Sequence, residues 1–254
     1  MTARSSIRRR TLEALVLGVA LWVGACSSSG SSSAPTTTAP AAVATTTTTT
    51  SPATTTTAPC APAAAPSAVV HESDAAGDVD GDGAVDAVAV YGLGSTDRPG
   101  PWMVSATVRG TRYDAPIADA DPDDPTQPVR VLGVAATMPS PTVVVAVGTG
   151  ASSTSIGLFQ LVDCTLTRVH GQDGKPYPLA IGGSVTTLTG LRCDGGGLVV
   201  LRATSNDGET YTTEQTALDL AAGAVTAADQ PPGTASAADV ADYGHLSCPG
   251  VEPL

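Results

Sequence analysis

The chain has 254 residues, a formal net charge of -12, and aromatic residues at only 3% of its sequence. Its 27 Gly, 20 Pro and single Phe show that much of this length cannot build a conventional aromatic core. The acidic balance excludes a generic nucleic-acid-binding surface, and the length is too short for a large multidomain enzyme. We therefore expect one domain, or two small ones, after residue 67.

The first 25 residues are typical of an export signal. Four arginines form its positive region, Arg4, Arg8, Arg9 and Arg10. The apolar stretch that follows, 14–23, is too short to cross a bilayer, which needs about 20 apolar residues. The adjacent arginines suggest twin-arginine (Tat) export, but Glu13 stands where that signal prefers an apolar residue. Both the Sec and the Tat route therefore stay open.

Val23-Gly24-Ala25-Cys26 resembles the lipobox of bacterial lipoproteins. In that family, small residues before the cysteine admit the processing enzyme, and the thiol receives a diacylglycerol. The resemblance implies acyl chains such as palmitate on Cys26 and a location on the outer face of the cell membrane; the alternative is an ordinary secretory signal. Cleavage before Cys26 leaves a net charge of -15, so the acyl chains and not a basic patch would hold the protein to the membrane.

Residues 26–67 form a linker that consists almost entirely of Ser, Thr, Ala and Pro and carries no charged side chain. Such a segment cannot bury enough apolar surface to offset the entropy of ordering it, so we expect disorder with polyproline character. It is either a bare spacer or an acceptor of O-linked sugars. The folded domain is then expected at 68–254.

Four cysteines remain after Cys26, and an even number in an exported chain predicts two disulfides with three possible connectivities. Cys164 and Cys193 each end an apolar run, so we expect them to join neighbouring strands. Cys60 and Cys248 would then connect the two ends of the folded region. A zinc site is the alternative, but the chain lacks a CxxC spacing.

The rest of the chain alternates short apolar runs with Gly, Pro, Asn and Asp, which predicts an all-β domain. Asn206-Asp207-Gly208 is a strong hairpin signal, and only 236–243 has a helical pattern. We expect strands over 85–90, 102–109, 129–134, 142–147, 156–162, 184–191, 198–204 and 210–217.

The segment 78–86 carries four aspartates within nine residues. Hard Ca²⁺ takes about six to eight oxygen ligands, which alternate residues of a tight turn can supply. Asp78, Asp80 and Asp82 would give three carboxylates, the Ala84 carbonyl a fourth ligand, and Asp86 a fifth. Without a cation these carboxylates would repel one another, so ion binding and local order should be coupled.

The sequence Gly-Asp-Val-Asp-Gly-Asp-Gly-Ala-Val-Asp-Ala-Val-Ala-Val, at 77–90, resembles the calcium loop of FG-GAP and VCBS repeats. It differs from an EF-hand, because Ala89 occupies the position of the final Glu and a strand is expected to follow. The resemblance implies a loop between propeller strands in an extracellular adhesion or surface module. A propeller of six or seven blades, each about 50 residues long, exceeds the available chain. We therefore expect a partial or shortened propeller-like array, or a β-sandwich that carries one calcium loop.

A second acidic segment, 117–124, has prolines where glycine freedom is expected, so it is either a degenerate repeat or a solvated loop. The sequence has no catalytic motif, and Trp102 is more typical of a core residue than of a sugar platform. The favoured function is binding or interaction with an unknown protein or glycan at the cell surface. The alternatives are an envelope hydrolase acting on glycan or ester, and an accessory subunit of a wall or secretion complex.

Overall fold

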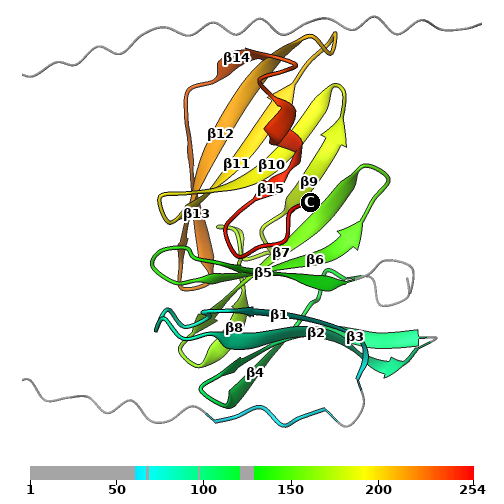
Figure 1. Ribbon diagram of the computed structural model, residues 1–254, viewed down its shortest axis with the longest axis vertical. Helices are drawn as coiled ribbons and strands as arrows, with labels where there is room; N and C mark the ends of the chain where they lie inside the picture. Colours follow the sequence, from blue (N-terminus) through cyan, green and yellow to red (C-terminus); the bar gives the residue numbers. More distant parts are fainter. Residues whose placement is uncertain (1–60, 67–68, 97, 121–128) are drawn as a thin grey trace, which may run out of the picture. The chain divides into compact units, whose positions relative to one another are not determined.

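The structure, a computed structural model, describes residues 61–66, 69–96, 98–120 and 129–254. These residues form β-strands and one short 3-10 helix, Ala241–Gly244, and contain no α-helix. The predicted all-β class is therefore confirmed. The strands form two sheets, of which the smaller has four strands and the larger eleven (Figure 1).

The smaller sheet is an antiparallel meander whose strands follow one another in chain order (Figure 1). A two-residue turn joins its last two strands, and both turn residues, Arg109 and Gly110, have positive φ. This backbone twist matches that of the flanking strands, which is why such turns favour tight hairpins. The strands are β1 (Val70–Gly77), β2 (Asp86–Ser95), β3 (Arg98–Val108) and β4 (Thr111–Pro116).

The larger sheet has the strand order β13-β12-β11-β10-β9-β7-β6-β5, and three short strands pair onto this path. All its strand pairs are antiparallel except that of β10 with β15. Its strands are β5 (Arg130–Ala135), β6 (Thr142–Thr149), β7 (Ser153–Val162), β8 (Thr165–Arg168), β9 (Leu179–Ser184), β10 (Thr187–Asp194), β11 (Gly197–Thr204), β12 (Thr210–Ala221), β13 (Ala224–Asp229), β14 (Gly233–Ser236) and β15 (Leu246–Ser247).

Two hydrophobic clusters hold these sheets together. The first joins the smaller sheet to one face of β5, β6 and β7, with members such as Val104, Val145 and Phe159. The second lies on the opposite face of β6 and β7 and includes Val144 together with Val200 of β11. The larger sheet folds back on itself, since the Met138 N–H in the connection between β5 and β6 donates to the Gly196 carbonyl in the turn between β10 and β11. Strand β6 is buried on both faces, as its unbroken apolar run indicates.

All eight predicted strands correspond to strands of the structure, and the hairpin at 206–208 joins β11 to β12. The prediction missed the shorter strands β4, β8, β14 and β15, and also β1, β9 and β13. The predicted helix over 236–243 is wrong: the chain there makes turns and then the 3-10 helix at 241–244. Trp102 is 3% exposed, which confirms its predicted place in the core.

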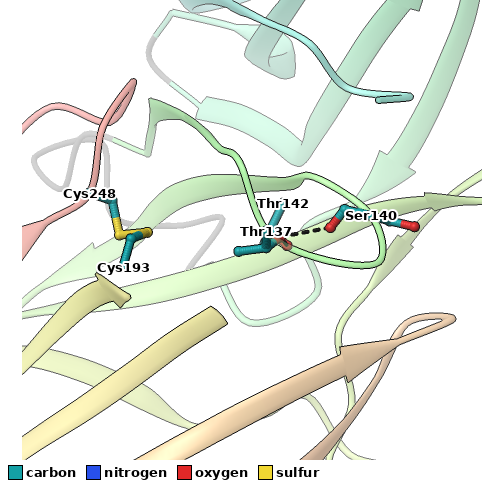
Figure 2. The surroundings of a disulfide bond; sticks show 5 residues. All are labelled: Thr137, Ser140, Thr142, Cys193 and Cys248. Atoms are coloured by element: carbon teal, nitrogen blue, oxygen red, sulfur yellow. Dashed lines mark hydrogen bonds between the residues drawn. A yellow bond between two sulfur atoms is a disulfide. The ribbon is translucent and has the colours of Figure 1, made fainter. Parts of the chain in front are cut away.

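The predicted disulfide pairing is wrong, because Cys193 bonds Cys248 and not Cys164 (Figure 2). Strand β9 lies between β7 and β10, so Cys164, in the turn after β7, is not beside Cys193. The parallel pairing of β15 with β10 instead brings Cys248 to Cys193. Cys164 is disulfide-bonded as well. Cys60, which was predicted to pair with Cys248, lies outside the described residues.

Buried hydroxyl groups fix the connection between β5 and β6 close to this disulfide (Figure 2). The Thr137 Oγ1 donates to the Ser140 carbonyl at 2.6 Å and lies 2.7 Å from the Thr142 Oγ1. Gln160 is fully buried on β7 and donates its amide to the same Ser140 carbonyl, while its Oε1 accepts the Gly223 N–H. These bonds satisfy polar groups that burial would otherwise penalise.

Candidate metal site

The acidic loop 78–86 connects β1 to β2 at one end of the smaller sheet. Gly77 and Asp86 are Cα partners in the β1–β2 pairing, so the loop begins and ends at the same rung of the ladder. Asp86 is 6% exposed, and its Oδ2 accepts the Val79 N–H at 2.9 Å. This buried carboxylate therefore closes the base of the loop.

Backbone N–H groups surround the Asp78 carboxylate. Its Oδ1 accepts from Gly81 at 2.7 Å and from Asp82 at 3.1 Å, and its Oδ2 accepts from Gly83 at 2.9 Å. Gly81 and Gly83 both have positive φ, a backbone conformation that a Cβ would oppose. The two glycines thus allow the chain to wrap around one carboxylate.

Three carboxylates converge inside this turn. Single oxygen atoms of Asp78, Asp80 and Asp86 lie within 4.8 Å of one another. Carboxylates this close repel each other, and a hard divalent cation with oxygen ligands would relieve the repulsion. The donor set therefore fits a hard divalent cation such as Ca²⁺.

Asp82, the fourth aspartate of the loop, faces an arginine from another hairpin. The Arg109 Nε and Nη2 donate to its Oδ2 at 2.8 and 2.6 Å, and Nη2 also lies 3.1 Å from the Asp80 Oδ2. The Ala84 N–H donates to the other Asp82 oxygen at 2.7 Å. This bond and the Arg109 guanidinium hold the pKa of the Asp82 carboxyl below its ordinary value.

Of the five predicted ligands, the structure thus brings three together, Asp78, Asp80 and Asp86. Asp82 is bound by Arg109, and Ala84 contributes a backbone N–H to Asp82. Arg109 lies 27 residues beyond Asp82 and was not among the predicted site residues. The sequence around Arg109 indicates a turn at Arg109-Gly110, but it does not indicate that this turn contacts the acidic loop.

The other predicted functional positions lie outside the described residues or have a different partner. Cys26 and Cys60 fall among residues that the structure does not describe. In the second acidic segment the described Asp119 pairs with Arg168, whose Nη2 lies 2.6 Å from the Asp119 Oδ2. Residues 121–124 of that segment lie outside the described residues.

Comparisons of the chain with protein-family models, with curated proteins and with solved structures gave no match. Among the described residues, no helix has the length and apolar character needed to cross a membrane.

Proposed function

We propose that the chain is a lipid-anchored protein of the bacterial cell envelope and that its β domain binds Ca²⁺. The domain would bind a protein or glycan partner at the cell surface. The calcium proposal rests on one observation, the convergence of the Asp78, Asp80 and Asp86 carboxylates within 4.8 Å. The anchor is proposed from the lipobox-like sequence that ends at Cys26.

In this proposal the ion has a structural role. Asp78, Asp80 and Asp86 would hold it, with Asp82 and the Ala84 carbonyl as the remaining predicted ligands. A bound divalent cation supplies positive charge that offsets the repulsion among the loop carboxylates. The loop would then keep the ends of β1 and β2 in register.

We further propose a sandwich-like arrangement for the domain in preference to a propeller-like one. Support comes from the first hydrophobic cluster, in which side chains of the smaller sheet pack against those of β5, β6 and β7. Two sheets that share one buried layer are typical of sandwiches.

Thermal unfolding of the purified full-length chain, with and without Ca²⁺, tests the calcium proposal. Ligands that bind only the folded state raise the melting temperature, so we expect Ca²⁺ to raise it and Mg²⁺ to raise it less. Replacing two carboxylates of the loop, Asp80→Ala with Asp82→Ala, should abolish the shift.

The matched control removes the same charge from the larger sheet, Asp194→Ala with Asp219→Ala, and should keep the calcium shift. An unshifted wild-type protein, or a shift that survives in the loop variant, would reject the calcium site.

A further inference from the structure

A pocket of about 710 Å³ opens on the larger sheet, away from the acidic loop. This volume lies in the range of small-molecule sites. Strands β7, β9, β10 and β11 contribute to its lining, and the segment 175–178 crosses beside them. The segment is fixed in place, because the Tyr177 N–H donates to the Val169 carbonyl and the Lys175 carbonyl accepts the Gly171 N–H. The polar lining side chains are Asp119, Ser155, Arg168, Lys175, Tyr177, Thr189 and Arg202.

Arg168 gives this pocket a positioned positive charge. Its side chain is 9% exposed and its guanidinium lies over the Phe159 ring, 5.1 Å from the centroid. A Cβ at Gly157 would collide with this guanidinium, so the glycine provides the space in which it lies. Burial lowers the pKa of Arg168, and its counter-ion Asp119 is only partly buried. The charge is therefore costly to bury, and an anion in the pocket would stabilise it.

The pocket is also lined by Lys175 and Arg202. Among the residues whose side chains are described, these are the lysine and arginine side chains that form no ion pair. Every arginine whose side chain is described, other than Arg202, pairs with a carboxylate. Arg202 and Lys175 form no such pair with a described residue, although Glu214 is the cross-strand partner of Arg202. Lys175 and Arg202 are exposed, and both line the same pocket as the buried Arg168, in a chain of net charge -12.

The remaining lining groups suit an organic ligand. Tyr177, Ile156, Leu179 and Val200 provide apolar surface, and the hydroxyls of Ser155 and Thr189 add hydrogen-bonding groups. Asp119 is the one carboxylate among the described lining residues, and Arg168 occupies it. Small-molecule sites combine an apolar lining with a few polar groups in this way.

We propose that this pocket binds a small organic anion, a molecule of about monosaccharide size that bears a phosphate or carboxylate group. Lys175 and Arg202 would contact the anionic group, and Arg168 would add its charge from the pocket lining. The proposal rests on the binding role proposed above and gives it a ligand class, but it does not involve the calcium loop.

Isothermal titration calorimetry of the full-length chain tests the proposal, with glucose 6-phosphate, glucuronate and uncharged glucose as probes, in buffer without added Ca²⁺. We expect saturable binding of at least one charged probe and none of glucose. Because hydrogen bonds to charged groups are strong, Arg202→Gln and Lys175→Gln should each weaken binding by about tenfold. Preference for one charged probe would identify phosphate or carboxylate as the recognised group.

Arg192→Gln is the matched control, because Arg192 is a partly exposed arginine of β10 that pairs with Asp194 outside the pocket. It should leave the affinity unchanged. Equal binding of all three probes, binding of none, or equal affinities in the Arg202 and Arg192 variants would overturn the proposal. Because these titrations contain no added Ca²⁺, a failed calcium shift and a failed anion titration are separate results.

Discussion

At the scale of single residues, individual carboxylates organise the turns of this domain. Asp207 is the clearest case: in the hairpin between β11 and β12, its Oδ1 accepts the Glu209 and Thr210 N–H groups and the Ser205 hydroxyl. These bonds, led by that of Thr210, lower the pKa of Asp207 to about 2 from 3.8. The charged form is therefore favoured in the folded protein.

This shift predicts a pH-dependent contribution to stability. A depressed folded-state pKa stabilises the protein above pH 3.8, and this contribution is lost as the pH falls towards about 2. We expect Asp207→Ala to lower the melting temperature at pH 7. The difference in melting temperature between this variant and the wild type should become smaller as the pH falls from 3.8 to about 2. The control is Asp219→Ala, at an exposed position of β12, which should differ little from wild type across the series. A gap for Asp207→Ala that persists unchanged at pH 2 would contradict the prediction.

The candidate metal site shows what residue spacing can predict. Asp78, Asp80 and Asp86 lie in one short loop, so their convergence follows from the local sequence. Arg109 lies in the turn between β3 and β4. Only the packing of this hairpin beside the acidic loop brings the Arg109 guanidinium to Asp82. The anion pocket was not predicted for the same reason, because Arg168, Lys175 and Arg202 come from three separate segments.

At the scale of elements, the short strand β15 shows why disulfide connectivity was mispredicted. It has two residues, too few for any periodic signal, and it pairs parallel to β10 across a long stretch of chain. The apolar runs next to Cys164 and Cys193 predicted strands, but they did not predict the order of those strands in the sheet. Because strand order decides which cysteines are neighbours, the pairing required the three-dimensional structure.

The Cys193–Cys248 bond closes a stretch of 55 residues. Loop-closure entropy predicts that a crosslink of this span stabilises the fold by up to about 4 kcal/mol. We therefore expect the double variant Cys193→Ser, Cys248→Ser to lose about 2 to 4 kcal/mol of unfolding free energy, measured by urea denaturation. Non-reducing peptide mapping should first recover the 193–248 crosslinked peptide from the wild-type protein. A double variant as stable as wild type would show that the crosslink adds nothing to the fold.

At the scale of the whole domain, the sheets approach closely because their contact residues are small. Gly77 of β1 lies against Val134 of β5, and a Cβ on Gly77 would stand 2.5 Å from the Val134 Cβ. Aromatic residues make up only 3% of the chain, which is consistent with so close an approach of the sheets. The class and most long strands were predictable from apolar periodicity, whereas the folding back of the larger sheet was not, since it depends on contacts between distant strands.

A larger side chain at this contact should push the sheets apart. We expect Gly77→Val to lower the unfolding free energy by about 1 to 3 kcal/mol, the usual cost of overpacking a core. Ala76→Val, one residue earlier on the exposed face of β1, adds bulk to the same strand and should be nearly neutral. Urea denaturation of both variants measures the difference. Equal stability of the two variants would contradict close packing at Gly77.

The two outer edges of the larger sheet are each covered in short pieces. Strand β12 has twelve residues, but β14 pairs with its first part and β13 with its second. At the other edge, the 250–252 segment takes hydrogen bonds along β5: the Val134 N–H donates to the Gly250 carbonyl, and the Glu252 N–H donates to the Leu132 carbonyl. A long, straight edge strand is a template for pairing with another chain. Within the described residues, dividing one edge of the larger sheet and covering part of the other therefore shortens the continuous backbone with which neighbouring copies of the protein could pair.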